Sequence, residues 1–339
     1  MQTLIDAQKK LLPDLLEIMQ KRYQILQHIR LMQPIGRRVL STNLGISERV
    51  LRSEVQFLKE QNLIDVSSAG MSVTLEGSEL LKNLEDMMKE VSGLKDLEKQ
   101  IKSLLDIKDV IVVAGDSDLS PWVKKEMGRA CVACMKERLT HQSIVAVTGG
   151  TTLAAVAEMM TPELKQIDIL FVPARGGLGE DVKNQANTIC ARMAEKAMGN
   201  YRLLHVPDQL SDEAYQSMIE EPAIKEVLEL IRSSNMVIHG IGDAITMAER
   251  RKTPREEIEK IKQRHAVAEA FGYYFNQEGE VVHKVKTMGI QLEDVKKVEH
   301  VIAVAGGASK AKAIKAYMKQ AHHSVLITDE GAARELIRE

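Results

Sequence analysis

The sequence predicts a two-part α/β protein, with an N-terminal winged helix-turn-helix domain and a C-terminal doubly wound, mostly parallel Rossmann-like sheet. Five of the 21 glycines lie in the first 106 of 339 residues and sixteen lie after them. After residue 108, short β-branched runs alternate with helical stretches of 10–18 residues, which is typical of an open parallel sheet with helices on both faces. We expect a DNA-binding domain at 1–88, a helical linker at 89–107 and a ligand-binding domain at 108–339.

The composition excludes several classes of protein. With 44% hydrophobic residues, 28% charged residues and a net charge of −2, the chain has the material for a packed core. Its longest apolar runs are about five residues, as at Val110–Ala114, whereas a membrane-spanning helix needs about 20. No signal-peptide pattern opens the chain, and its three cysteines fit reduced thiols, so a cytoplasmic location is expected.

Positive charge is concentrated in residues 21–60. That window holds eight Lys and Arg against three acids, a local charge of +5, so the remaining residues sum to −7. The near-neutral total therefore conceals a basic segment, which is the electrostatic pattern expected of a DNA-binding region.

A helix-turn-helix is predicted inside this window. Residues 35–44 form one short helix, Gly45 and Ile46 make the turn, and Ser47 can N-cap a second helix that reaches about Asn62. The apolar side chains expected to pack the two helices together are Val39, Leu40, Leu44, Ile46, Val50, Leu51, Val55 and Leu58.

The first turns of the second helix then face outward, where a recognition helix contacts base edges. The side chains assigned to DNA there are Ser47, Glu48, Arg49, Arg52 and Ser53. Arg37 and Arg38 are further candidates, although they could equally be ordinary surface charges. Leu63–Val66 and Met71–Val73 predict a two-stranded wing with Gly70 at its tip, followed by a helix capped by Thr74. Double-stranded DNA is the expected partner, because only 11 aromatic residues are available for stacking on single-stranded bases.

A heptad-like pattern follows the wing. Its apolar positions are spaced four and three residues apart and are Leu80, Leu84, Met87, Val91, Leu94, Ile101 and Leu105, with Glu98 in the same seam and Gly93 as a weak point. The pattern could pair two subunits, which gives the expectation of a homo-oligomer, a dimer or a tetramer. It could equally describe a helix packed on its own domain.

Seven strands are predicted in the second part of the chain. They are Val110–Ala114, Ile144–Val147, Ile169–Val172, Leu203–Val206, Met236–His239, Val301–Ala305 and Val325–Thr328. A hairpin-like pair around Gly279, made of Tyr273–Asn276 and Val281–Lys284, interrupts the alternation.

Four of these strands end in glycine-containing loops, at 148–152, 174–179, 239–243 and 305–310. In a parallel sheet such loops gather at the carboxyl edge, where ligands bind at a topological switch point. Glycine allows close backbone approach, and the next helix presents free N–H groups to an anion. Thr151 and Thr152 open such a helix, and Arg175 and Lys310 on two other loops could converge on the same phosphate.

Other chemistry finds less support. Neither glycine pair completes a dinucleotide-binding G-x-G-x-x-G, and there is no P-loop. Cys131 and Cys134 lack a second pair at metal spacing, so no metal site is predicted. The histidines are expected to be core or surface residues, and no catalytic residue is assigned. Asp181, Asp243 and Glu269 are loose candidates for the base of a sugar-phosphate enzyme.

The ordered motifs resemble those of a known family. The helix-turn-helix, the run from Thr148 to Thr152, the run from Phe171 to Gly179, Asn187–Ala191, Val237–Gly242 and Val304–Gly307 together resemble the sugar-responsive bacterial repressors of the SorC/DeoR type. The resemblance covers essentially the whole chain. It implies that the C-terminal domain is built like sugar-phosphate isomerases and deaminases of the NagB type but serves as a sensor.

The resemblance also implies an effector and its site. For the member of the family that controls glycolysis, the effector is fructose 1,6-bisphosphate, an allosteric ligand, and no cofactor is expected. One phosphate site would comprise Gly149, Gly150, Thr151, Thr152, Arg175 and Lys310. Gln185, Arg250 and Glu269 would reach the sugar and the second phosphate, with Arg251 an alternative to Arg250. Two rival functions stay open, namely a sugar-phosphate enzyme with a regulatory DNA-binding domain and an activator that senses another phosphosugar.

Overall fold

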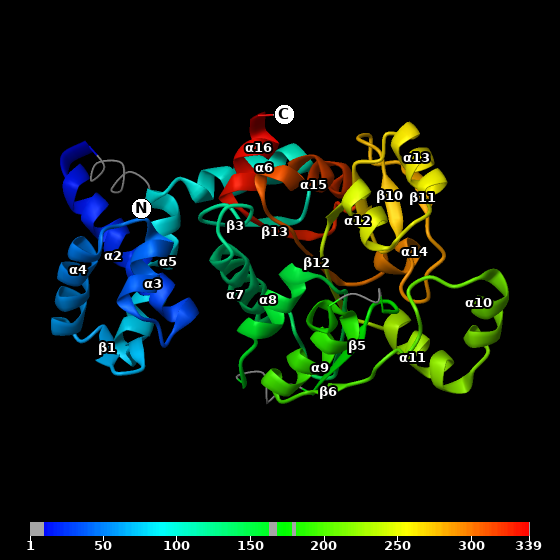
Figure 1. Cartoon of the computed structure of the whole chain (residues 1–339), viewed down its shortest axis with the longest axis horizontal. Coiled ribbons are helices and arrows are strands. Elements are labelled where there is room, and N and C mark those ends of the chain that lie inside the picture. Colours follow the sequence, from blue (N-terminus) through cyan, green and yellow to red (C-terminus); the bar gives the residue numbers. More distant parts are fainter. Residues whose placement is uncertain (1–9, 163–167, 178–180, 339) are drawn as a thin grey trace. The chain divides into compact units, whose positions relative to one another are not determined.

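The computed structural model describes residues 10–162, 168–177 and 181–338. The chain forms two compact units, Met1–Asp96 and Leu97–Glu339, each of which has its own hydrophobic core. The helices and strands of both units are labelled in Figure 1.

The first unit is a winged helix. Its elements are α2 (Pro13–Met32), α3 (Arg37–Leu44), α4 (Glu48–Glu60), β1 (Ile64–Ser67), β2 (Gly70–Val73) and α5 (Leu75–Val91). The predicted signals act as expected. Gly45 ends α3 in the left-handed region at φ +64°, the Ser47 hydroxyl accepts a 3.3 Å bond from the amide of Val50, and the Thr74 hydroxyl accepts one of 3.0 Å from Gly77.

The core of this unit contains the predicted Leu40, Leu51, Val55 and Leu58, all buried. The prediction is wrong for Val39 and Val50, whose side chains are 57% and 42% exposed. Ser41 takes the inward position in α3 instead, because its hydroxyl donates to the Ile46 carbonyl at 2.7 Å across the turn. A satisfied hydroxyl can therefore occupy a place that hydrophobicity alone assigns to a valine.

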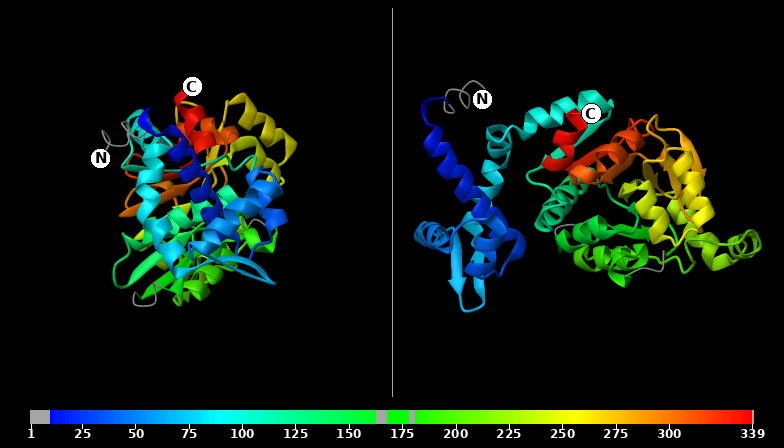
Figure 2. Two further views of the ribbon diagram at one scale, coloured as in Figure 1. Left: turned by 90° about the vertical axis from the view of Figure 1, so that its left-hand side faces the viewer. Right: turned by 45° about the horizontal axis from the view of Figure 1, so that its top comes forward.

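The wing is the antiparallel pair β1 and β2, in register from Ile64–Val73 to Ser67–Gly70, and it projects from the helices as the light-blue hairpin in Figure 2. Its base is tied to the start of the helix-turn-helix, because Ile35 and Met71 exchange backbone hydrogen bonds of 3.1 and 2.8 Å. Gly70, at φ +136°, lies against this bridge, and a Cβ there would meet the Ile35 backbone at 2.8 Å.

The continuous seam predicted from Leu80 to Leu105 is not one helix. Helix α5 ends at Val91, Gly93 adopts φ +74°, and α6 (Leu94–Leu105) starts afresh, so Gly93 is a helix-ending residue rather than a weak point within a helix. Leu80, Leu84 and Met87 pack on the core of the first unit, and Glu98 accepts a 2.9 Å bond from the amide of Val112. The first half of the pattern therefore packs on its own domain, which is the second of the two predicted alternatives.

The second unit is built on a seven-stranded sheet. Among the described residues its strands are β3 (Asp109–Val113), β4 (Ser143–Val147), β5 (Ile169–Pro173), β6 (Asn200–Tyr201), β7 (Met236–His239), β12 (His300–Val304) and β13 (Val325–Asp329). The order is β3-β13-β12-β7-β4-β5-β6, and every pairing in it is parallel. The winding reverses between β7 and β4, so the topological switch point lies between these two strands.

Helices cover both faces of the sheet. Helices α7 (Trp122–Lys136), α8 (Thr151–Met159) and α9 (Ala186–Ala197) pack side by side on one face (Figure 1). Helices α7, α8 and α9 connect strands towards the β6 edge of the sheet. Because the crossovers are right-handed, helices that connect strands towards the β3 edge lie on the other face. These are α11 (Pro222–Arg232), which follows α10 (Asp212–Ile219), and α15 (Ala311–Met318); α16 (Glu330–Arg338) follows β13. Two short 3-10 turns, η2 (Val182–Asn184) and η3 (Ala308–Lys310), lead into α9 and α15.

One predicted strand is misplaced. Leu203–Val206 is not a strand, and the edge strand is the shorter β6 at Asn200–Tyr201. The Asn187 side chain supplies hydrogen bonds to the backbone of this segment. Asn187 Nδ2 donates to the Leu204 carbonyl at 3.0 Å, and Asn187 Oδ1 accepts from the Leu204 backbone N–H at 3.1 Å. The apolar side chains of Leu204 and Val206 are buried, so the hydrophobicity of the segment reflects burial rather than strand pairing.

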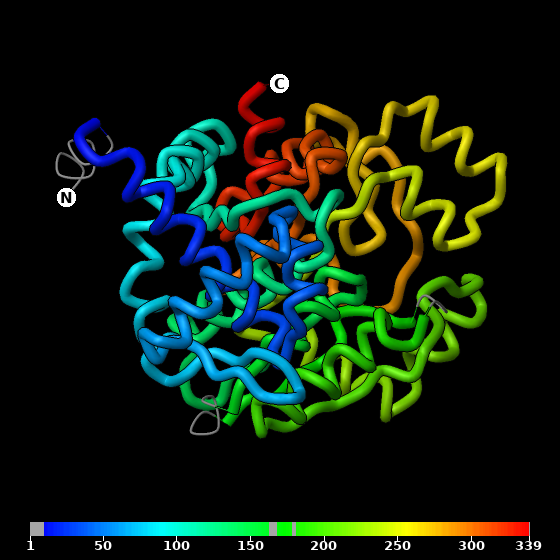
Figure 3. The backbone as a smooth tube through the Cα atoms, turned by 60° about the vertical axis from the view of Figure 1, so that its left-hand side comes forward, coloured from blue at the N-terminus to red at the C-terminus, as the bar shows by residue number. Residues whose placement is uncertain are grey.

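Between β7 and β12 the chain leaves the main sheet, as the yellow and orange tube in Figure 3 traces. The predicted hairpin is confirmed as β10 (Tyr273–Phe275) and β11 (Val281–Lys284). The sequence did not predict its extension by β8 (Gly242–Asp243) and β9 (Ala268–Ala270) into a four-stranded antiparallel sheet, order β11-β10-β9-β8. Helices α12 (Ala244–Arg250), α13 (Arg255–Gln263) and α14 (Leu292–Val295) accompany it.

The remaining expectations concern absences. No described helix combines the length and the apolar character needed to cross a bilayer. Within the same residues, no three His, Cys, Asp or Glu side chains are grouped as metal ligands. Cys131 and Cys134 are buried in α7, and burial raises the pKa of Cys134 to about 11, as expected for inert core thiols.

Candidate functional site

A pocket opens at the topological switch point of the sheet, between the loops that follow β4 and β7. The space between its lining residues is about 640 Å³ when the part open to solvent is included. Of the predicted effector residues, those that line it are Gly149, Gly150, Thr151, Thr152, Arg175, Arg250, Glu269 and Lys310. The glycine loops predicted to gather at the carboxyl edge of the sheet therefore do meet there.

One end of the pocket is the start of α8. Gly150 precedes the helix at φ +123° and donates its N–H to the Asn184 carbonyl at 2.8 Å. Gly149 leaves no room for a side chain, because a Cβ would lie 2.7 Å from the same carbonyl. The two glycines thus turn the chain so that the first amides of α8 and the hydroxyls of Thr151 and Thr152 face the pocket, which is an anion-binding arrangement.

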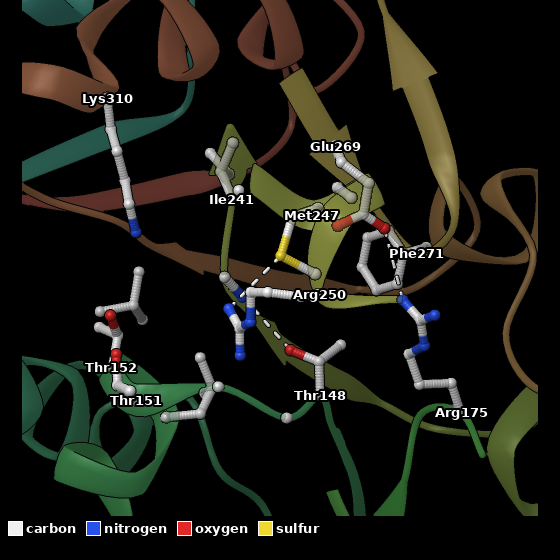
Figure 4. A pocket seen from close by; sticks show the side chains of 17 residues that line it. Thr148, Thr151, Thr152, Arg175, Ile241, Met247, Arg250, Glu269, Phe271 and Lys310 are labelled. Carbon is white, nitrogen blue, oxygen red and sulfur yellow. Dashed lines mark hydrogen bonds and ion pairs between the residues drawn. The ribbon is translucent and has the colours of Figure 1, made fainter. Parts of the chain in front are cut away.

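Lys310 reaches into this end from η3, and Figure 4 shows its amino group directed at Thr152. Its ammonium makes no hydrogen bond or ion pair with another described residue. Burial lowers its pKa, and Lys124 lowers it further while Asp118 opposes the change. A cation held in this way without a direct partner is prepared to accept an anionic group.

The two adjacent arginines have different places. Arg250 lines the pocket between Lys310 and Arg175 (Figure 4) and lies 3.5 Å from the Met247 sulfur. Arg251 has a side chain that is 0% exposed and does not line the pocket. The choice that the sequence left open therefore falls on Arg250 as the arginine positioned to touch a ligand.

Arg251 belongs to a buried charge cluster, which we call the acid–arginine square: Arg175 and Glu269, which line the pocket, and Arg251 and Asp208, which do not. Arg251 donates to Asp208 at 3.2 Å and to Glu269 at 2.6 Å, and Arg175 donates to Asp208 through Nε at 2.7 Å and also through Nη2. The Arg175 Nη1–Glu269 Oε1 distance is 3.4 Å. Two positive and two negative charges thus neutralise one another without solvent, as a buried cluster requires.

This cluster sets the state of Glu269. Burial alone would raise its pKa, but Arg251, Arg175 and the amide of Gly272 outweigh burial and lower it. Glu269 is therefore held as a carboxylate, whereas a general base working near neutral pH needs a raised pKa. Asp181, which pairs with Lys183 at 3.0 Å, and Asp243, which caps α12 through the Thr246 amide at 2.8 Å, do not line the pocket.

Three predicted site residues depart from the expected arrangement. Gln185 occupies the N-cap position of α9 without a side-chain capping bond. Its Oε1 lies 3.3 Å from the position that a Cβ of Gly177 would take, and Gln185 is not part of the pocket lining. Arg175 and Lys310 do not converge, because Arg250 lies between them and Arg175 is turned towards Glu269 (Figure 4). Residues 178–180 of the glycine loop lie outside the described part of the chain.

The candidate DNA-binding side chains lie on one unit and are accessible. Arg37, Arg38, Ser47, Glu48, Arg49, Arg52 and Ser53 are all exposed. An open surface of α4 is formed by Arg49, Arg52, Ser53 and Gln56. Gln56 was not among the predicted DNA-binding residues. Gln56 lies one further turn along the same helix face, so the i, i+3, i+7 spacing from Arg49 could have found it.

Two cations of the basic segment serve a structural purpose. Lys21 and Arg22 of α2 bind the two Glu54 oxygens at 2.6 and 2.8 Å, and they lower the Glu54 pKa against the effect of burial. This clamp fixes α4 on α2. The wing has no Lys or Arg between Ile64 and Val73, so any phosphate contact from it must use hydroxyls or amides.

Two family models match separate parts of the chain. The family model of the sugar-binding domain matches residues 89–338, and the model of the CggR N-terminal DNA binding domain matches residues 18–88. The central glycolytic genes regulator of Priestia megaterium is 70% identical over 100% of this chain and 99% of its own length. That of Bacillus subtilis is 66% identical over the full length of both.

The chain belongs to the family of central glycolytic genes regulators. The predicted resemblance to SorC-type regulators is thereby confirmed, and so is the expectation of a transcriptional regulator rather than an enzyme. The chain contains a DNA-binding domain and a sugar-binding domain, so DNA and a sugar effector are among its partners.

Solved structures support the same fold. A SorC family transcriptional regulator from Enterococcus faecalis is 48% identical, with a TM-score of 0.68 over 71% of this chain and 99% of that one. The full-length sorbitol operon regulator SorC of Klebsiella pneumoniae has a TM-score of 0.69 over 90% of this chain and 94% of that one. At 17% identity the second likeness bears on the fold alone.

Proposed function

We propose that this central glycolytic genes regulator is a cytoplasmic repressor that binds operator DNA through α4 and is released by fructose 1,6-bisphosphate bound in the pocket at the switch point. Ligand binding weakens operator affinity only if the ligand prefers the form of the protein that binds DNA less well. The protein acts as a homo-oligomer, a dimer or a tetramer, in this proposal.

The observation that carries the proposal is the distribution of cationic groups along the pocket. Lys310 and the α8 N-terminus form one end, Arg175 lies at the other and Arg250 lies between them (Figure 4). A ligand with a phosphate at each end of a sugar could engage both ends at once. A monophosphate could engage only one of them.

The DNA-binding half of the proposal rests on exposed cations. Arg49 and Arg52 lie on the first turns of α4, the position from which a recognition helix reaches base edges. Arg37 and Arg38 at the start of α3 are exposed and suit phosphate contacts, which fix the register of a protein on the duplex.

A gel shift with promoter DNA from glycolytic genes tests both halves together. We expect a retarded complex with the protein alone and its loss when fructose 1,6-bisphosphate is added. A complex that persists or strengthens with the bisphosphate would contradict repression relieved by this ligand and would favour an activator. Fructose 6-phosphate at the same concentration is the control.

Calorimetric titration tests the assignment of the effector. We expect fructose 1,6-bisphosphate to bind at least tenfold more tightly than fructose 6-phosphate, a difference of about 1.4 kcal/mol. Equal affinities would contradict a pocket that engages two phosphates.

A further inference from the structure

The acid–arginine square contains one member whose role the proposed function does not use. Asp208 lies between β6 and α10, with a side chain that is 3% exposed, and it does not line the pocket. Nevertheless it holds the pocket residue Arg175 by two guanidinium nitrogens, Nε at 2.7 Å and Nη2. In this structure, therefore, two nitrogens that could grip a ligand phosphate are occupied by a protein carboxylate.

We propose that Asp208 is an internal anion that competes with the phosphate of the effector for Arg175 and so sets the affinity of the pocket for anionic sugars. The proposal rests on the proposed function, because it takes Arg175 to be a ligand-binding residue. Asp208 itself is a positioning residue that acts through Arg175.

The geometry gives Asp208 an alternative partner when Arg175 leaves. Its Oδ2 accepts from Arg251 Nε at 3.2 Å, and Arg251 is fully buried and also bound to Glu269 at 2.6 Å and to the Tyr274 hydroxyl at 2.9 Å. Asp208 would thus keep one buried cation after the exchange, which avoids the large cost of an unpaired buried charge. Arg175 is the arginine of the square that lines the pocket, so a phosphate bound there can reach its guanidinium.

The replacement of Asp208 by a phosphate as the partner of Arg175 also affects the backbone around Asp208. Two backbone hydrogen bonds connect the loops of Arg175 and Asp208. The Gly177 N–H donates to the Val206 carbonyl at 3.0 Å, and the Asp208 N–H donates to the Gly177 carbonyl at 2.9 Å. These bonds join the Arg175 loop to the segment that leads into α10. When a phosphate takes Arg175 from Asp208, this segment loses a side-chain anchor.

The first test replaces the competing charge. Asp208→Asn keeps the size of the side chain and removes its negative charge, so we expect it to bind fructose 1,6-bisphosphate about tenfold more tightly than the unchanged protein in calorimetric titration. Damage to a merely structural residue can only weaken binding, so unchanged or weaker binding by a folded Asp208→Asn protein would overturn the proposal. Asp208→Glu retains the charge and should not tighten binding.

The matched control is Asp212→Asn. Asp212 lies four residues after Asp208, and its exposed carboxylate is paired with Lys286. This substitution should leave the affinity unchanged. Inorganic phosphate is titrated in parallel as a minimal anionic probe. If the unchanged protein binds inorganic phosphate or fructose 6-phosphate but not the bisphosphate, the effector assignment fails, while the competition by Asp208 is still judged by whether Asp208→Asn tightens binding of that probe.

A second measurement needs no variant. Hydrogen exchange of the intact protein should slow at residues 174–177 and accelerate at residues 206–212 when fructose 1,6-bisphosphate is added, because the ligand replaces Asp208 as the partner of Arg175. Faster exchange at 206–212 supports the exchange of partners. Unchanged exchange there on saturation with ligand would overturn it, even if Asp208→Asn did not fold.

Discussion

The imidazole of His239 is closed in by Tyr317, whose hydroxyl oxygen lies 3.2 Å from His239 Nε2. The centroid of the tilted Phe271 ring lies 4.5 Å from that of the imidazole, and His239 Nδ1 lies 3.0 Å from the Gly240 carbonyl. Burial lowers the pKa of His239 to about 4, although its bond to Gly240 and the charge of Glu269 oppose the change. His239, expected to be a core or surface residue, is therefore a buried neutral group at the end of β7, next to the pocket residues Gly240 and Phe271.

The stability of the sensor domain should depend on this histidine in mildly acidic solution. The unfolded chain takes up a proton near pH 6.5 and the folded protein only near pH 4, so stability is lost as the pH falls through this window, by up to about 3 kcal/mol. Urea unfolding at pH 7 and at pH 5 measures the loss. His239→Gln, which cannot titrate, should lose less stability between the two pH values, and an equal loss would contradict the assignment.

Effector affinity should fall in alkaline solution because of Lys310. Its pKa is lowered by burial and by Lys124 and Arg250, against Asp118 and Asp329, and the uncharged amine holds a phosphate weakly. Above pH 7 the ligand phosphates are already dianionic, so calorimetry between pH 7 and 9.5 isolates the lysine. Lys310→Arg keeps its charge over this range and should bind with little dependence on pH; if both proteins weaken alike, another group is responsible.

The loop before α8 should not tolerate a side chain. Gly150 has φ +123° with open space around it, so Gly150→Ala tests backbone strain alone, and we expect it to cost about 1–3 kcal/mol in effector binding and folding combined. Gly36 is the control, because a Cβ there also meets no atom while its φ is −77°. Thermal unfolding and calorimetry of Gly150→Ala should both change, whereas Gly36→Ala should resemble the unchanged protein.

The two functions should separate by mutation. Arg49→Ala and Arg52→Ala should abolish the gel shift and leave calorimetric sugar binding intact, because α4 and the pocket belong to different compact units. Thr152→Ala and Lys310→Ala should do the reverse. Lys225→Ala, which removes an exposed cation paired with Glu220 at 2.6 Å, controls for the loss of any positive charge. Loss of sugar binding in the α4 variants would show that the two units do not act separately.

Local signals account for what the sequence predicted well. The turn at Gly45, the caps at Ser47 and Thr74 and the wing at Gly70 each depend on residues within a few positions of one another. The glycine loops after β4, β7 and β12 were predicted for the same reason. The errors at Val39 and Leu203–Val206 arose where the Ser41 hydroxyl or the distant Asn187 amide met a requirement that hydrophobicity could not reveal.

The sequence by itself determined that this chain combines a basic winged helix with a sheet whose strand ends present glycine and cations to a phosphate. Its net charge of −2 was resolved into a basic segment and an acidic remainder without any coordinates. Only the tertiary structure decided that Arg250 faces the pocket while Arg251 is buried, and that Asp208 binds Arg175 from 33 positions further along the chain. The physical reason is that such pairings depend on which strands lie side by side, and strand order is a property of the whole sheet that no local pattern encodes.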